Sequence, residues 1–276
     1  MQIIDSLNDP GKGKGTGDDR FGFDTATGRA WVIDGSTDVG GRRVMASEES
    51  DAAWLAQTVS EAYAAISPTE DESTSAHMRR ALERVKTRSA MESLHPLDQV
   101  PRYCWPTGAG VFFWQRNDTQ AEIAALGDCI GLVETESEPL ICGYVGKADE
   151  ESETARAMLK LTDAERQKQF QAFRGTHNTE NGYWVYGLDP DAADKALITS
   201  VEVIAGRHVL LMSDGLFRLV SPYQHFSPKE MLQAAIVQGL ESIFQTLRGF
   251  ETSSEDDAKH GRYKTRDDAC AVLIRF

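Results

Sequence analysis

The stretch WVIDGSTD, Trp31–Asp38, changes abruptly from apolar to polar at Asp34-Gly35. A short run of β-branched and aromatic residues before Asp-Gly is typical of a strand that ends in a turn. Aspartates flank further apolar runs in GDDRFGF (17–23), AALGDCIGL (124–132), VLLMSDGLF (209–217) and DDACAVLI (267–274). An aspartate therefore marks the end of a predicted strand at five places in the chain.

Apolar runs and helical spacing alternate along the chain and predict an α+β fold. Strands are predicted at about 20–24, 29–33, 109–115, 121–127, 130–134, 139–145, 198–204, 208–213 and 269–275. Helices are predicted over 54–66, 78–91 and 227–248, with a more polar helix within 151–174. Short turns favour antiparallel sheets, and helix pairs then cover their outer faces. We expect a four-layer α-β-β-α sandwich of two mainly antiparallel sheets, as one domain over 1–276 with a flap-like insertion at about 147–190.

The composition excludes several classes of partner. The net charge of the 276 residues is −14, which argues against nucleic acid and anionic membranes as partners. No run of about 18 apolar residues predicts a membrane span, and the first residues do not resemble a signal peptide. The four cysteines form no CxxC pair, which argues against a zinc or redox motif and favours reduced thiols. These features predict a cytoplasmic protein.

Each aspartate taken alone is explained by an ordinary turn, but the set points to a shared site. If the strand ends converge, four or more carboxylates repel one another in a small volume unless cations lie among them. Carboxylate oxygens suit hard ions such as Mg²⁺ or Mn²⁺, and the six histidines show no HxxxH or HExxH spacing. Two such ions about 4 Å apart can hold a bridging hydroxide and clamp a phosphoryl group.

In their order along the chain, these motifs resemble those of the metal-dependent protein phosphatases, the type 2C serine/threonine phosphatases. The resemblance covers nearly the whole chain and implies the same α-β-β-α sandwich. It rests on the acidic pair of GDDRFGF, on AWVIDGSTDVGG, on TGAGVFFW with the Gly-Asp hairpin of AEIAALGDCIGL, on LLMSDGLFRLV and on DDACAVLI. One such motif is a weak signal, whereas five in the correct order make a strong match.

The resemblance implies roles for the residues around the first metal ion. Asp34 would bridge two ions and take part directly in catalysis, and the carbonyl of Gly35 would bind one of them. Asp214 and Asp267 would bind the first ion. The choice of Asp267 over Asp268 depends on register, because Asp268 stands where the family often has asparagine.

Further roles and two departures follow from the same resemblance. Asp19 would hold the second ion, mostly through water, with Asp18 beside it, and Asp128 would help to hold a third, weaker ion. Ser36 stands where some members have a histidine as a candidate acid, and a metal-bound water can donate instead. Lys14 stands where some members have a phosphate-binding arginine, and a lysine binds phosphate as a point charge.

The sequence thus leads to a metal-dependent hydrolase that removes phosphate from phosphoserine and phosphothreonine proteins through a metal-bridging hydroxide. Its cofactor would be two Mn²⁺ or Mg²⁺ ions, with room for a third, and its partner a phosphorylated protein. Three alternatives stay open, namely a catalytically weak phosphoprotein-binding regulatory module of the same fold, a phosphatase of small molecules, and an acidic structural protein whose carboxylates are only solvated. The complete set of core aspartates argues for retained metals, and the sequence does not name the substrate.

Overall fold

The computed structural model describes residues 1–11, 15, 17–46, 49–144, 158, 161–252 and 266–276. Its strands form two five-stranded sheets in which every described ladder is antiparallel. The β3 sheet consists, in order, of β2 (Asp19–Asp24), β3 (Arg29–Gly35), β4 (Gly108–Gln115), β5 (Gln120–Leu126) and β8 (Leu197–Glu202). The β9 sheet consists of β1 (Gln2–Asp9), β10 (Ala269–Arg275), β9 (His208–Met212), β6 (Ile130–Val133) and β7 (Leu140–Cys142).

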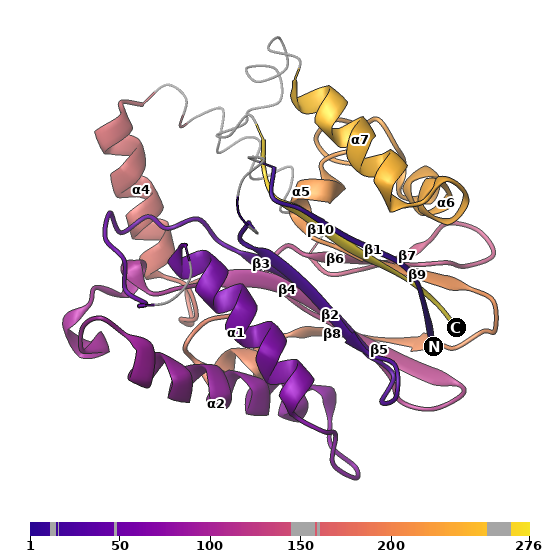
Figure 1. Cartoon of the computed structure of the whole chain (residues 1–276), viewed down its shortest axis with the longest axis horizontal. Coiled ribbons are helices and arrows are strands. Elements are labelled where there is room, and N and C mark those ends of the chain that lie inside the picture. Colours follow the sequence, from indigo (N-terminus) through magenta and orange to yellow (C-terminus); the bar gives the residue numbers. More distant parts are fainter. Residues whose placement is uncertain (12–14, 16, 47–48, 145–157, 159–160, 253–265) are drawn as a thin grey trace.

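Two helix pairs cover the outer faces of these sheets (Figure 1). The pair α1 (Asp51–Ala65) and α2 (Thr74–Glu92) packs on the β3 sheet, and the pair α6 (Pro228–Gln238) and α7 (Leu240–Glu251) packs on the β9 sheet. The connections contain α4 (Asp163–Gly175), α5 (Asp214–Phe217) and the 3-10 helices η1 (Leu97–Gln99), η2 (Arg102–Cys104) and η3 (Pro190–Lys195). The predicted four-layer sandwich is confirmed. None of the described helices is long and apolar enough to cross a bilayer.

Alternate side chains of β3 point into two different cores. Trp31 and Ile33 belong to the core beneath α1 and α2, whereas Ala30 and Val32 belong to the core between the two sheets. A third core, which includes Phe244, joins the β9 sheet to α6 and α7. A strand buried on both faces needs an apolar residue at every position. This explains the unbroken apolar run before Asp-Gly and leaves only the strand end free to present a polar group.

The loop that follows β3 is fixed against the first turn of α1. The Ser50 hydroxyl caps the helix by accepting a hydrogen bond from the Ala53 N–H at 2.9 Å. The Asp51 carboxylate accepts the N–H groups of Val44 and Met45 at 2.7 and 2.8 Å. Because Asp51 is itself buried, these charge-assisted bonds hold the loop close to the start of the helix.

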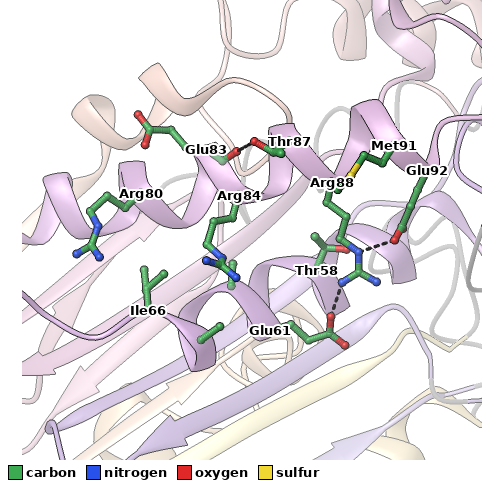
Figure 2. A pocket seen from close by; sticks show the side chains of 12 residues that line it. Thr58, Glu61, Ile66, Arg80, Glu83, Arg84, Thr87, Arg88, Met91 and Glu92 are labelled. Carbon is green, nitrogen blue, oxygen red and sulfur yellow. Dashed lines mark hydrogen bonds and ion pairs between the residues drawn. The ribbon is translucent and has the colours of Figure 1, made fainter.

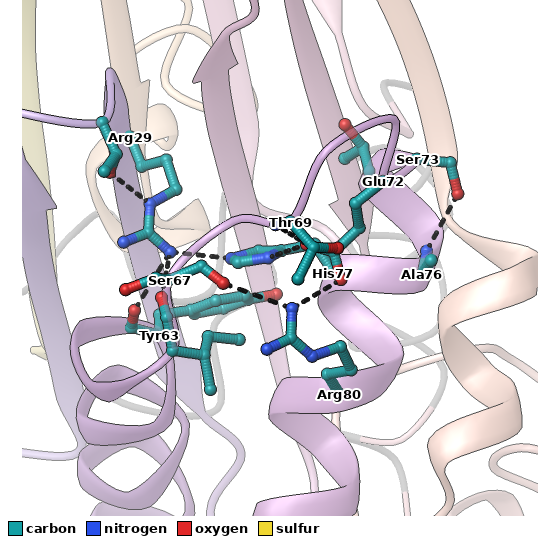
Figure 3. Close-up of polar contacts among 12 residues, drawn as sticks. Arg29, Tyr63, Ser67, Thr69, Glu72, Ser73, Ala76, His77 and Arg80 are labelled. Carbon is teal, nitrogen blue, oxygen red and sulfur yellow. Dashed lines mark hydrogen bonds and ion pairs between the residues drawn. The ribbon is translucent and has the colours of Figure 1, made fainter.

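A buried polar network ties α1 and α2 to the other end of β3 (Figure 3). Nη1 of Arg29 lies 2.8 Å from Nε2 of His77, and Nδ1 of His77 lies 2.9 Å from the Glu72 carboxylate. Because arginine can only donate, Nε2 accepts and Nδ1 carries the proton that is donated to Glu72. Burial lowers the pKa of His77, which agrees with a neutral ring. Arg29 also donates to the Ile66 carbonyl at the end of α1 (2.7 Å).

Two features of the β9 sheet differ from the sequence-based expectation. The polar strand β1 is not among the predicted strands, yet it pairs along its length with β10. The single helix predicted at 227–248 is wrong, because Gly239 at φ +81° separates α6 from α7. The Leu240 N–H at the start of α7 donates to the Asp5 carboxylate of β1 at 2.8 Å. This hydrogen bond therefore connects the start of α7, at the break in the helix, to the additional strand β1.

Part of the predicted insertion at 147–190 lies outside the described residues, namely 147–157, 159 and 160. Its described helix α4 contacts the loop after β3, because Gln171 donates to the Val39 carbonyl at 3.1 Å and Arg174 donates to the Thr37 carbonyl at 3.0 Å. The flap-like role of this segment and the single-domain interpretation stay predictions.

Candidate metal centre

One cavity of about 140 Å³ lies where strand ends from both sheets meet. Every predicted metal-binding residue lines it, namely Asp18, Asp19, Asp34, Gly35, Asp128, Asp214 and Asp267. The rest of its lining consists of Ser36, Thr37, Ala109 and Asp268. Lys14, the predicted phosphate-binding residue, lies outside the described residues. The fold thus gathers aspartates from distant parts of the sequence into one small volume.

Asp19 and Asp34 face each other across the ladder between β2 and β3. Asp19 is only 1% exposed, whereas Asp34 is half-buried in the cavity wall. The Gly35 N–H donates to the Asp18 carbonyl at 3.2 Å. A Cβ on Gly35 would lie 2.5 Å from the Ala52 carbonyl oxygen, so only glycine allows the end of β3 to approach α1 this closely.

Asp128 and Asp214 enter the cavity from two connections. The predicted Gly-Asp hairpin is wrong, because β5 and β6, on either side of Asp128, belong to different sheets. The chain crosses between the sheets at Gly127 (φ +84°), where a Cβ would lie 2.5 Å from that of Ala109. Asp214 is the first residue of α5, directly after β9. Asp128 thus stands where the chain crosses from one sheet to the other, and Asp214 stands at the end of β9.

Ser213, which precedes Asp214, is a site residue that sequence reasoning missed. Its hydroxyl accepts the Cys270 N–H at 3.0 Å and forms a hydrogen bond with the Asp19 carboxyl. Its own N–H donates to the Cys270 carbonyl at 3.0 Å. Ser213 is completely buried and so joins β9, β10 and the acidic strand end of β2. The only signal for it in the sequence is its place before Asp-Gly.

Asp267 and Asp268 precede β10 and have different partners. The Asp267 carboxylate pairs with Nη2 of Arg218 at 2.6 Å, a partner that the sequence did not suggest. The Asp268 carboxylate accepts the N–H of Asp18, whose own carboxylate accepts the Ser50 hydroxyl at the start of α1. Both aspartates line the cavity.

Burial and mutual repulsion raise the pKa values of the central carboxyls. The pKa of Asp19 is raised well above its usual value by burial and by the charge of Asp268. The pKa of Asp34 is likewise raised by burial and by its neighbours Asp19 and Asp214. The pKa of Asp214 is raised by burial and by the charge of Asp128. These carboxyl groups can therefore lie this close together only when bound protons or cations offset their negative charge.

The donor set fits hard divalent cations. The Oδ2 atom of Asp19 is buried without a hydrogen-bond partner in the described structure, which leaves a lone pair for a cation. The acidic lining supplies carboxylate oxygens, the ligands that Mg²⁺ and Mn²⁺ prefer. Among the described residues, however, no three His, Cys, Asp or Glu side chains already surround one point as a ligand set. Ion binding would therefore require the carboxylates to exchange their present partners for the metal.

A larger cavity of about 770 Å³ lies between α1 and α2, away from the predicted residues (Figure 2). Arg80, Arg84 and Arg88 extend into it from successive turns of α2. Arg88 pairs with Glu61 and with Glu92 across this groove. Acidic and basic side chains are mixed along this groove, and none of the predicted metal-binding residues lines it. The smaller acidic cavity is therefore the candidate site, although it has the smaller volume.

Comparison with known proteins assigns the fold. No protein-family model and no curated protein matches the sequence. Among solved structures, the serine/threonine phosphatase PstP/Ppp of Mycobacterium tuberculosis is similar over 98% of this chain and 97% of that chain, with 15% identity and a TM-score of 0.57. Stp1 of Staphylococcus aureus is similar over 100% of this chain and 96% of that chain, with 14% identity and a TM-score of 0.56.

The catalytic domain of PstP in complex with two manganese ions is also similar, with 16% identity, a TM-score of 0.54, and coverage of 97% of this chain and 95% of that chain. At these identities the comparison shows a shared fold along the whole chain. This chain therefore has the fold of bacterial serine/threonine phosphatases, and its chemistry has to be argued from its own cavity.

Proposed function

We propose that this protein is a metal-dependent phosphomonoester hydrolase that acts on phosphoserine and phosphothreonine in proteins. The observation that carries the proposal is the single cavity lined by seven aspartates and Gly35, on a fold shared with serine/threonine phosphatases. One of those neighbours holds two manganese ions, which supports Mn²⁺ or Mg²⁺ as the cofactor here. The protein substrate is inferred from the same neighbours.

The ligands divide between the two sheets in this proposal. Asp34 would bridge two ions, Asp214 and Asp267 would hold the first, and Asp19 with Asp18 would hold the second. Asp128 and Asp214 would hold a third, weaker ion. Bound ions would supply a good nucleophile from water at neutral pH and would offset the charge of the phosphoryl group.

The remaining lining of the cavity would help to orient the substrate. Ser36 and Thr37 follow Gly35 and line the cavity, and their hydroxyl groups are of the kind that bind phosphate oxygens, whereas the Ser36 N–H donates to the Thr107 carbonyl at 2.9 Å. Arg174 of α4 holds the Thr37 carbonyl from outside, so the position of this loop depends on α4. The proposal therefore assigns the loop after β3 to binding of the phosphoryl group and α4 to positioning that loop.

Phosphate release from a phosphothreonine peptide tests the proposed function, with EDTA, Mg²⁺ and Mn²⁺ in parallel. We expect release by the wild-type protein only with a metal ion. Loss of a group that only supports a metal ligand costs about 10- to 100-fold in metal affinity or activity, so loss of the proposed bridging ligand in D34N should cost at least about 100-fold. Asp118→Asn, the same change in an exposed turn, serves as the matched control and should leave activity unchanged.

The outcomes separate the proposal from its alternatives. Full activity of folded D34N, or release in EDTA, would refute the metal mechanism. Release from an aryl phosphate but never from phosphopeptides would indicate a small-molecule phosphatase. Metal binding without release from any substrate would indicate a regulatory phosphoprotein-binding module. Circular dichroism of each variant shows whether it remains folded.

A further inference from the structure

Arg218 brings a permanent positive charge to the acidic cavity. It follows α5, four residues after Asp214, and its N–H donates to the Asp214 carbonyl at 3.0 Å. This helical turn directs the guanidinium toward the start of β10, where Nη2 lies 2.6 Å from Oδ2 of Asp267. Both side chains are 19% exposed, so the pair is mostly shielded from water.

The Asp267 carboxylate is held on both of its oxygens. Oδ2 accepts from Arg218, and Oδ1 accepts the Asp268 N–H at 3.2 Å. The Asp267 N–H donates to Glu251 at 3.3 Å, and the completely buried Glu251 in turn pairs with Arg248 at the end of α7. The backbone of Asp267 is thus anchored from α7, while its carboxylate faces the cavity and Arg218.

The guanidinium and a divalent cation make competing demands on this carboxylate. A cation near Asp214 and Asp267 would take up the same oxygen lone pairs that Arg218 now uses, and two positive charges would then repel each other. Nη1 of Arg218 is buried without a hydrogen-bond partner in the described structure, so its pairing with Asp267 satisfies the guanidinium only in part. A bound cation must therefore offset the cost of leaving this buried guanidinium without Asp267.

We propose that Arg218 is a positioning residue that competes with the metal ion for Asp267 and thereby lowers the affinity of the site for divalent cations. In the metal-free protein Arg218 neutralises part of the acidic cluster and preserves the fold, and on ion binding it releases Asp267. The inference rests on the proposed function, because it takes Asp267 as a metal ligand.

Calorimetric titration of Mn²⁺ into wild-type protein, R218Q and R218K at one fixed pH tests this role. Without the competing charge, R218Q should bind Mn²⁺ about tenfold more tightly, while its metal-free form should melt at a lower temperature. R218K keeps the charge and should restore an affinity within about threefold of wild type. Arg207→Gln removes an equal charge ahead of β9, at the opposite end from Asp214, and should change neither quantity.

These readouts distinguish competition from simple structural support, which would weaken ion binding and lower the melting temperature together. Unchanged or weaker Mn²⁺ binding by R218Q would overturn the role of Arg218 and leave the proposed function standing. Absence of binding by both wild type and R218Q would overturn the metal centre and this role with it. If R218Q does not fold, chemical modification of Arg218 by phenylglyoxal in the wild-type protein tests the proposal instead. Mn²⁺ should increase the rate of this modification several-fold, because Arg218 is then released from Asp267. An unchanged rate would refute competition.

Discussion

The carboxyl of Asp19 is 1% exposed, and its Oδ2 has no hydrogen-bond partner in the described structure. Burial and Asp268 raise its pKa in the folded protein above the value of 3.8 expected for a free side chain. The native state then holds a proton that the unfolded chain has already lost. Stability of the metal-free protein therefore falls as pH rises from about 4 toward the raised pKa.

Asp19→Asn should stabilise the metal-free protein at pH 7.5 by at least about 1 kcal/mol, because one pKa unit corresponds to about 1.4 kcal/mol. The amide carries no charge and supplies donors beside Asp268. The advantage should shrink as the pH falls toward 4, because the unfolded wild-type chain then takes up the proton that native Asp19 already holds. Urea unfolding in EDTA at pH 5, 6 and 7.5 measures this difference.

Asp24, at the other end of β2, is the control with the opposite sign. Its bonds to Thr27 and Arg29 lower its pKa, so its stabilising effect is present at neutral pH and is lost only in acid. Asp24→Asn should therefore lower stability at pH 7.5, by up to about 1 kcal/mol. A D19N protein that is less stable than wild type at pH 7.5 in EDTA would contradict the argument.

At the residue scale, the sequence is sufficient to identify the acidic residues but not their partners. The spacing of apolar runs marks Asp34 and Asp214 as strand-end residues, and both line the cavity. The contacts of Ser213 with Asp19 and of Arg218 with Asp267 cross between segments far apart in the chain. Such pairs depend on how the strands are ordered in space, which local patterns do not encode.

At the element scale, the close approach of β3 to α1 depends on Gly35. Gly35→Ala would place a methyl group 2.5 Å from the Ala52 carbonyl oxygen and 2.7 Å from that of Asp18. We expect a loss of about 2 kcal/mol in stability, as for other overpacked sites. Because the strand end must shift, Mn²⁺ affinity should also fall at least about tenfold.

Gly249→Ala is the matched control for this substitution. Gly249 lies inside α7 with no atom within 4 Å of an added Cβ, so alanine should stabilise the helix by about 0.5–1 kcal/mol. Thermal unfolding and Mn²⁺ titration of the two variants give the comparison. Wild-type stability and metal binding in G35A would show that the strand end has more freedom than its contacts imply.

Most elements could be predicted because their own residues determine them. The core strands alternate into two apolar layers, and the N-terminal cap of α1 is local. The exceptions depend on tertiary contacts. The polar strand β1 is held by its ladder with β10, and the helix predicted at 227–248 is divided where Asp5 of β1 reaches the N–H of Leu240. Neither contact leaves a periodic signal in the sequence.

At the scale of the whole molecule, the candidate site joins the two sheets. Asp19 and Asp34 belong to the β3 sheet, whereas Asp214 and Asp267 adjoin strands of the β9 sheet. A cation bound by both sets would link the sheets and would favour the folded state over the unfolded chain. Metal binding should therefore be visible in the unfolding of the entire protein.

Mn²⁺ at about one hundred times its dissociation constant should stabilise the protein by about 2.7 kcal/mol for one site, or raise Tm by about 5 °C. Calorimetric melts in EDTA and in Mn²⁺ at equal ionic strength measure the change. Hydrogen exchange should slow in β3 and in β10 together. A melting temperature that is insensitive to Mn²⁺, or protection confined to one sheet, would contradict a shared site.

The position of β10 in its sheet has a consequence for biosynthesis. β10 is the last element along the chain, yet it lies between β1 and β9, and it directly follows Asp267 and Asp268. A nascent chain that has emerged only as far as α7 therefore exposes two unpaired strand edges, which are the surfaces where unrelated chains aggregate. It also lacks part of its acidic cluster. The β9 sheet and the acidic cluster are therefore completed only after β10 has been synthesised.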